Sequence, residues 1–359
     1  RQRLAQRPRR RGRSPLGAGP VTEELPGSGA PGPGARALVI ANPTAGGRDP
    51  LAVVRLAAGL ASMGCRVEVR DTARRGDAAD MACAASLSPS APSVIVAVGG
   101  DGTISEVVEG LMRGAALRGG ALPGPGLAIL PLGTTNVLAR ELGLSRNPDD
   151  LLALIAGSAP RPMHVGRVGD RHFTVMASAG FDARVIQGVS LGLKRWCGRG
   201  AYVLAALAEL ARPQPARYVV EFPGGEAPSA EVGGVVVAKG RYYGGSFVCA
   251  RQASVARRSL HVCLFGDPGR LGVLRYAARI LGGSIERAGG FRIVEAESVL
   301  ISGLACEPVQ ADGDIVGRLP VRVTLADEPL MVWGRHGSGD DPFPGKELPA
   351  AEAAELTPG

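Results

Sequence analysis

The sequence is poor in aromatic residues and has no paired cysteine motif. Phe, Trp and Tyr make up 4% of the 359 residues, which leaves few rings on which nucleic-acid bases could stack. The six cysteines form no Cys-x-x-Cys pair and no metal-type spacing with the four histidines, so neither a zinc site nor a disulfide framework is expected. Reduced cysteines are typical of the cytoplasm. We therefore expect a cytoplasmic protein that does not bind nucleic acid.

No stretch is long and apolar enough for a membrane-spanning helix, and no secretory signal is visible. The longest uncharged run, residues 119–139, contains three prolines, and proline breaks the interior of a helix. Hydrophobic residues nevertheless make up 45% of the chain, which indicates a globular protein. Because single cores seldom grow beyond about 250–300 residues, we expect two domains.

Acidic residues are in the minority, with 33 Asp and Glu against 41 Lys and Arg. Residues 1–35, rich in Arg, Pro and Gly, and residues 337–359, rich in Pro and acids, are expected to be disordered tails. The first tail is basic and the second acidic, and the body between them is basic as well. A basic body suits an anionic ligand or an anionic membrane surface.

The most informative stretch covers residues 94–112. Its first five residues are apolar without alternation, which predicts a strand buried on both faces of a parallel sheet. Apolar residues at helical spacing then predict a helix from Ile104, and Thr103 with Glu106 fits a capping box at its start.

Between this strand and this helix lie Gly99, Gly100, Asp101 and Gly102. Glycines let the backbone approach a ligand, and a helix N-terminus offers unpaired N–H groups, so the loop suits a phosphate. Such a turn can also serve only to pack a helix on a sheet. Asp101 favours the ligand, because a carboxylate beside a phosphate needs a cation or a donor hydroxyl between them.

The same pattern of strand, polar loop and helix recurs along residues 36–158. Alternating strands and helices predict a doubly wound parallel sheet whose polar loops share the carboxyl edge, where ligands bind. The other strands expected here are 37–42, 67–70 and 127–130, with helices at 50–63 and 137–142.

The chain changes character after residue 158. Short strands dominate residues 159–325 and predict a second, mainly antiparallel β domain, from which residues 326–336 return to the first. We expect strands at 171–176, 218–222, 234–238, 260–265, 298–301 and 321–325, and helices near 200–211 and 271–281.

Five motifs in order now point to a family: NPTAGG, VGGDGTISEVVEGL, PLGTTNVLARELGL, GFDA and a late DGD. Together they resemble the diacylglycerol kinase catalytic family, which includes bacterial lipid kinases and the sphingosine and ceramide kinases. The resemblance covers roughly residues 36–335 and implies a fold like that of NAD kinases and phosphofructokinases. It also implies ATP in the cleft between the domains, accompanied by Mg²⁺, with a lipid hydroxyl as the phosphate acceptor.

The resemblance also implies which residues line the nucleotide. The aspartate loop would hold phosphates, with Asp101 close to the nucleotide-bound metal. The implied nucleotide-binding residues are Asn42, Pro43, Thr44, Gly46, Gly47, Thr72, Gly99, Gly100, Asp101, Gly102, Thr103, Glu106, Gly133, Thr134, Thr135 and Asn136.

The catalytic base of the family comes from an Asp-Gly-Glu turn, which here reads Asp312-Gly313-Asp314. The resemblance implies Asp314 as the base, reaching less far than glutamate, with Asp312 as its partner or a metal contact. A polar hairpin turn with no catalytic role would have the same sequence.

Two departures concern a second, structural magnesium site. Many relatives have acids where this chain has His164 and the pair Ala256-Arg257. Because Mg²⁺ requires oxygen ligands, we expect this site to be absent, with Arg257 or Arg258 supplying positive charge instead.

The expected function is that of an ATP-dependent lipid kinase associated with the membrane surface. The acceptor would be an alcohol of the diacylglycerol, sphingoid or ceramide type. For the oligomeric state, a homodimer is one of the alternatives. Candidates for contact with an anionic bilayer are residues 193–199 and, on the later helix, Arg270, Arg275 and Arg279. The alternatives are an NAD-kinase-like enzyme and an inactive lipid-binding homologue.

Overall fold

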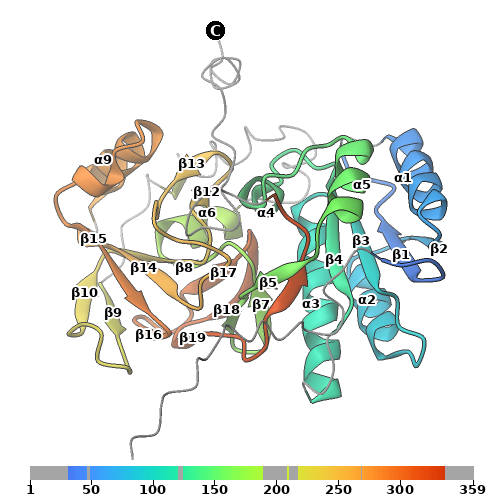
Figure 1. Cartoon of the computed structure of the whole chain (residues 1–359). Helices are drawn as coiled ribbons and strands as arrows, with labels where there is room; N and C mark the ends of the chain where they lie inside the picture. The colour runs from blue at the N-terminus through green and yellow to red at the C-terminus, as the bar shows by residue number, and fades with distance from the viewer. Residues whose placement is uncertain are drawn as a thin grey trace, which may run out of the picture.

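The computed structural model describes residues 31–46, 49–119, 124–188, 208–209, 217–267 and 269–335. Gly47, residues 193–199 and nearly all of the expected tails and of the expected helix at 200–211 lie outside these residues. Two bodies lie side by side in Figure 1, an α/β domain built around one sheet and a domain built of two further sheets.

The first domain is organised around a six-stranded sheet in the order β2-β1-β3-β4-β20-β5. All pairs from β2 to β20 are parallel, and β5 is antiparallel to β20. The predicted parallel sheet is therefore confirmed. Its strands are β1 (Arg36–Ala41), β2 (Arg66–Asp71), β3 (Val94–Gly99), β4 (Gly126–Pro131), β5 (Arg161–Met163) and β20 (Leu330–Val332).

Helices cover both faces of this sheet. On one face α1 (Pro50–Ser62) and α5 (Pro148–Gly157) pack over Val39, Val96 and Ala128. On the other, α2 (Asp77–Leu87) and α3 (Asp101–Arg118) form a second core with the alternate strand residues (Figure 1). Alternation between two cores explains why every residue of β3 is buried, each large side chain contributing about 1.5–3 kcal/mol.

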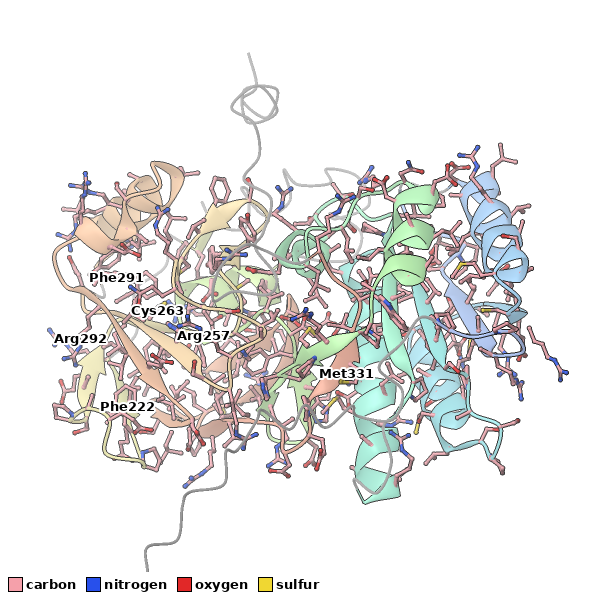
Figure 2. The ribbon with its side chains drawn as sticks, viewed as in Figure 1. Phe222, Arg257, Cys263, Phe291, Arg292 and Met331 are labelled. Carbon is pink, nitrogen blue, oxygen red and sulfur yellow. The ribbon has the colours of Figure 1, made fainter. Side chains whose placement is uncertain are left out.

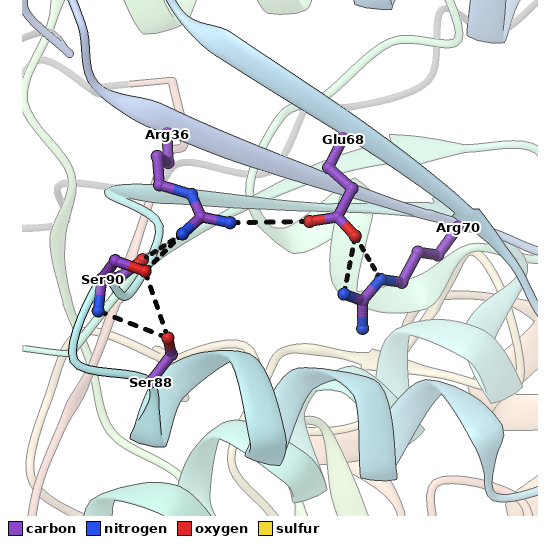
Figure 3. Close-up of polar contacts among 5 residues, drawn as sticks. All are labelled: Arg36, Glu68, Arg70, Ser88 and Ser90. Atoms are coloured by element: carbon purple, nitrogen blue, oxygen red, sulfur yellow. Dashed lines mark hydrogen bonds and ion pairs between the residues drawn. The ribbon is translucent and has the colours of Figure 1, made fainter.

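The amino-terminal edge of the sheet is tied together by exposed polar contacts (Figure 3). Arg36 donates to the carbonyl and hydroxyl of Ser90 and lies 3.7 Å from Glu68. Glu68 in turn lies 2.6 Å from Arg70. Arg36 thereby holds the loop after α2 against the start of β1, and Glu68 and Arg70 continue the network along β2.

The second domain is a sandwich of two mainly antiparallel sheets, as predicted. Residues such as Val220 and Val323 from one sheet share a core with Val235 and Val262 from the other. The first sheet contains β10 (Ala230–Val232), β9 (Tyr218–Glu221), β16 (Ser298–Ser302), β19 (Val321–Leu325), β6 (Gly166–Val168) and β7 (Arg171–Phe173). The second contains β15 (Phe291–Ala296), β14 (Leu260–Phe265), β11 (Gly234–Ala238), β8 (Met176–Ala179), β17 (Pro308–Ala311) and β18 (Asp314–Arg318).

Smaller elements complete this domain beside the two sheets. Helix α6 spans Phe181–Gly188, and the hairpin of β12 and β13 spans Tyr242–Tyr243 and Phe247–Val248. Helix α9 (Arg270–Leu281) and a 3-10 turn at Ile285–Arg287 lie outside the sandwich core.

The single strand expected at 171–176 is wrong, because the segment divides between the two sheets. β7 ends at Phe173 and β8 begins at Met176. The N–H groups of Thr174, Val175 and Met176 all donate to the carboxylate of Asp312. That carboxylate takes the place of a neighbouring strand, so the chain can cross from one sheet to the other.

The chain returns to the first domain through β20 and Trp333. The Trp333 indole N–H donates to the carbonyl of Ser158 at 3.0 Å, and its ring fills the space beside Gly126. A Cβ on Gly126 would lie 2.4 Å from that ring. The buried indole thus joins the end of the described chain to the first sheet.

Candidate active site

Helix α3 begins directly after β3, with Gly100 as its N-cap and Asp101 as its first residue. The expected start at Ile104 is therefore wrong, and so is the capping box of Thr103 and Glu106. Among the described residues, no side-chain cap bonds the first turn of this helix. The N–H groups of its first turn are left without an intrahelical acceptor at the carboxyl edge of the sheet, which suits an anion.

The glycines of two loops let their backbones touch. A Cβ on Gly133 would lie 2.5 Å from the Cα of Gly100, and one on Gly99 would lie 2.6 Å from the hydroxyl oxygen of Thr103. A Cβ on Gly102, by contrast, would meet nothing within 4 Å. The loops after β3 and β4 therefore pack directly on each other, while the helix end beside them stays open.

The loop after β1 joins the same cluster. Asn42 donates to the Thr103 hydroxyl at 3.1 Å, and its carbonyl oxygen accepts from the backbone N–H and hydroxyl of Thr44. Gly46 lies close to Thr134, since an added Cβ would be 3.7 Å from the Thr134 hydroxyl. The structure thus brings together the three loops that the sequence placed at one edge.

The aspartate of the glycine loop binds a neighbouring helix. The Asp101 carboxylate accepts from the backbone N–H groups of Asn136 at 2.7 Å and Val137 at 2.6 Å, at the start of α4 (Val137–Glu141). The sequence indicated that Asp101 needs a cation or a donor hydroxyl beside it. The structure shows that two backbone N–H groups also donate to this carboxylate. The N-terminus of α4 is capped by Asp101 while that of α3 is open.

Asn136 shapes its own loop. Its side-chain oxygen accepts from the Gly133 N–H at 2.9 Å, and its side-chain N–H donates to the Gly133 carbonyl at 2.7 Å. Arg146 donates to the same carbonyl. With φ at 51°, Asn136 has a left-handed backbone that asparagine tolerates better than most residues. Thr134 is exposed and Thr135 is half-buried in the same loop.

The remaining predicted residues lie around this cluster. Thr72 follows β2, and its N–H donates to the Ala41 carbonyl at 2.8 Å, which places it at the same edge. Pro43 and Glu106 are half-buried. Glu106 lies on α3 beyond its first turn, so the helix geometry gives it no capping role.

The carboxylate of Asp312 forms hydrogen bonds within its own domain. Besides the three N–H groups of residues 174–176, its carboxylate accepts from the Thr174 hydroxyl at 2.9 Å. Burial raises the pKa of Asp312, and the four hydrogen bonds oppose that shift because they favour the carboxylate. This residue fixes the turn.

Asp314 contacts the first domain. Its carboxylate lies 2.6 Å from the Arg75 guanidinium, which belongs to the segment between β2 and α2. Both side chains are well exposed, at 42% for Asp314 and 71% for Arg75. Two acids two positions apart thus differ completely, because Asp312 is saturated by backbone donors and Asp314 lies accessible beside the other domain.

Behind the turn runs a buried polar chain that the sequence reading missed. Gln310 donates to the Ser178 hydroxyl at 2.7 Å and accepts from the Gly313 N–H at 2.9 Å. Ser178 donates to Asp182 of the GFDA motif, whose pKa burial raises. The only sequence signal was the recurrence of small and polar residues around GFDA. Through these hydrogen bonds Asp182 supports the turn at residues 312–314.

Glu141 was also missed, although it joins the two domains. Its carboxylate is 1% exposed and accepts from the Tyr242 N–H at 2.7 Å, with Arg241 at 3.4 Å. Burial raises the pKa of Glu141. An acid between the apolar residues of a short helix was the available signal. Glu109 of α3 makes a similar bridge, accepting from the His172 N–H at 3.0 Å.

Lys239 supplies the buried cation near His164. Its ammonium donates to the carbonyls of Ser254 at 2.5 Å and Arg257 at 2.6 Å, and the residue is 0% exposed. Lys239 thus adds a positive charge here that the sequence did not indicate, and the role expected for Arg257 or Arg258 stays a prediction. Burial, and then the nearby Lys239 and Arg258, lower the pKa of His164.

Across the described parts of the chain, no three His, Cys, Asp or Glu side chains gather as a metal site would require. The expected lack of a structural magnesium site stays a prediction. Within those same parts, no helix combines the length and the apolar character needed to cross a membrane.

An open helix N-terminus at a parallel-sheet edge, in a domain that an accessible carboxylate of the second domain contacts, suits phosphoryl transfer. Comparison of this chain with known proteins identifies the family. Residues 36–168 match the diacylglycerol kinase catalytic domain, and residues 175–334 match the YegS C-terminal NAD kinase beta sandwich-like domain.

Individual relatives point to the same family. A protein of Pseudomonas putida named "Probable lipid kinase YegS-like" is 34% identical over 236 residues, covering 64% of this chain and 74% of that protein. One of the same name from Chromohalobacter salexigens is 38% identical over 163 residues, covering 45% of this chain and half of that protein. The chain belongs to the diacylglycerol kinase catalytic family, which places it among the lipid kinases.

The fold has a counterpart among solved structures. A diacylglycerol kinase structure from Bacillus anthracis superposes with a TM-score of 0.63 at 20% identity, covering 83% of this chain and 96% of that one. At this identity the likeness concerns the fold, and it confirms the pairing of a parallel α/β domain with a β sandwich.

Proposed function

We propose that this protein transfers the γ-phosphate of ATP to the hydroxyl of a lipid alcohol of the diacylglycerol, sphingoid or ceramide type. The observation that carries the proposal is the contact between Asp314 and Arg75, which sets an accessible carboxylate beside the domain that holds the open α3 N-terminus. A reaction of this kind needs a phosphate site and a nearby proton acceptor.

The donor side of the proposed site consists of backbone. The first N–H groups of α3 point at the edge where three loops meet, and they bind phosphate oxygens without the desolvation cost of a buried cation. Gly102 leaves room above the helix end, and Gly46 with Thr134 closes the opposite side. ATP supplies the phosphoryl group at this edge.

On the acceptor side, Asp314 takes the proton of the lipid hydroxyl. The hydroxyl oxygen forms a bond to the γ-phosphorus, the bond from that phosphorus to the bridging oxygen breaks, and ADP leaves with the negative charge. Arg75 lies 2.6 Å from Asp314 and partly neutralises its charge. Asp312 holds the turn through its four hydrogen bonds.

Magnesium is proposed to arrive with the nucleotide. Carboxylate oxygens are ligands that a hard divalent cation prefers, and the Asp101 carboxylate lies at the loop edge where the phosphates would bind. Asp101 would thus contact nucleotide-bound Mg²⁺ while also capping α4. We further propose that the enzyme works in the cytoplasm, at a membrane surface.

The test is phosphate transfer from labelled ATP to a total membrane lipid extract in detergent micelles. We expect a labelled lipid with the wild-type protein and a loss of about 10²–10⁴-fold with Asp314→Asn, because that is the usual contribution of a general base. Asp170→Asn, an exposed acid in the β6–β7 turn, is the matched control and should keep full activity.

Two results would contradict the proposal. Labelling of NAD in place of lipid would make the protein an NAD-kinase-like enzyme. Lipid binding with no transfer to any acceptor would make it an inactive homologue.

A further inference from the structure

Helix α9 has an apolar stripe that faces solvent. Leu271, Leu274, Ala278 and Leu281 follow one another at helical spacing, and all four are exposed. The exposed fractions of the three leucines are 82%, 51% and 66% in chain order. A helix of a globular protein normally turns such a stripe toward the core, so its outward orientation indicates a binding surface.

The opposite side of α9 is firmly packed, which fixes this orientation. Tyr276 is buried with Ile285 and Ala288, and its ring lies edge-on to Phe265 with 5.2 Å between the ring centroids. Phe291, labelled in Figure 2, lies at the base of the same cluster. The leucines cannot turn inward without breaking this aromatic contact.

Arginines flank the stripe. Arg270, Arg275 and Arg279 lie on α9, which carries no acidic residue. Arg251 donates to the carbonyl of Gly283 just beyond the end of the helix. Nearby acids are present as well, with Asp267 3.5 Å from Arg275 and Glu286 exposed in the following turn. Positive charge nevertheless predominates around the leucines.

Leucines bordered by arginines complement an anionic bilayer, in which acyl chains meet phosphate headgroups at one plane. A second copy of the chain fits less well, because a symmetric contact through α9 would set arginines against arginines. Figure 1 shows α9 projecting on the same side as α4, whose N-terminus Asp101 caps at the proposed nucleotide edge.

We infer that α9 docks the protein onto anionic membranes, its leucines entering the headgroup region and its arginines contacting lipid phosphates. This inference rests on the proposed function, since docking would bring the active site to a lipid acceptor. Membrane contact and phosphate transfer are nonetheless separable by experiment.

The test is flotation with vesicles of phosphatidylcholine alone and of equal parts phosphatidylcholine and phosphatidylglycerol. We expect the wild-type protein to float with the anionic vesicles only. Leu271→Asp/Leu274→Asp should weaken that binding at least about tenfold, because it removes buried apolar area from the contact. Arg275→Gln/Arg279→Gln should weaken it less, and its binding should depend less steeply on salt.

The matched control is Leu51→Asp/Leu117→Asp, which alters equally exposed leucines on helices of the first domain and should float like the wild type. Transfer to lipid in detergent micelles should be unchanged in every α9 variant. A Leu271→Ser/Leu274→Ser variant repeats the test if the aspartates lower the melting temperature.

The possible outcomes separate the two proposals. A protein that is active in micelles but does not float, or whose α9 variants float normally, overturns the docking role alone. A protein that floats through α9 but transfers no phosphate overturns the proposed function alone. A dimer that the leucine variants dissociate, with vesicle binding unchanged, would assign the stripe to a second copy.

Discussion

The two domains each contain an aspartate bound by backbone N–H groups, but the two aspartates stabilise different parts of the structure. In the first domain Asp101 caps the neighbouring helix α4 and leaves the N-terminus of α3 open. In the second, Asp312 fastens the crossing between two sheets and leaves Asp314 accessible. In both domains an acid bound by backbone donors fixes the local structure beside a group that stays accessible, so an acid in a motif can have a structural role.

The largest effect on stability is expected for Asp312→Ala. The change leaves three N–H groups and the Thr174 hydroxyl without their acceptor, and each unsatisfied buried group costs about 1–3 kcal/mol. We expect the free energy of unfolding in urea to fall by more than about 3 kcal/mol. A fall no larger than that of Asp314→Asn would show that the two acids of the turn are equivalent.

A smaller effect is expected for Asp101→Ala, which removes the cap of α4. Loss of a capping carboxylate costs about 0.5–2 kcal/mol. Because Asp101 joins the loops after β3 and β4, ATP affinity should fall as well, as measured by calorimetry. Asn147→Ala, which removes the side-chain cap of α5, is the matched control and should leave ATP affinity unchanged. Unchanged ATP affinity in Asp101→Ala would limit the residue to a structural role.

The smallest effect on stability is expected for Glu109→Gln, at the contact of Glu109 with His172 between the domains. Burial tends to raise the pKa of Glu109, but its hydrogen bonds from His172 and its nearby charges leave the pKa lowered. A carboxyl with a lowered folded pKa contributes stability above its unfolded pKa, and this contribution is lost as the pH falls through the folded value.

The free energy of unfolding should therefore fall between neutral pH and about pH 3, which lies below the ordinary glutamate pKa of about 4.3. This fall should be smaller in Glu109→Gln. An identical pH dependence in the variant would contradict this assignment.

Local pattern was sufficient for much of the fold. The run at 94–98 predicted β3 to within one residue, and the strands at 234–238, 260–265 and 321–325 were placed correctly. The errors lay where a distant residue decides the local structure. Asp312 divides the strand expected at 171–176, and the N-cap of α3 is Gly100, which packs on Gly133 of the loop after β4, in place of Thr103.

The sequence alone determined the two-domain architecture, the family and the edge at which the loops gather, because periodicity and glycine positions are properties of neighbouring residues. Only the tertiary structure decided that Asp101 caps α4, that Lys239 binds the carbonyls of Ser254 and Arg257, and that Asp314 contacts Arg75. These contacts join residues far apart in the chain. Their partners follow from how the sheets and helices pack, which no local pattern records.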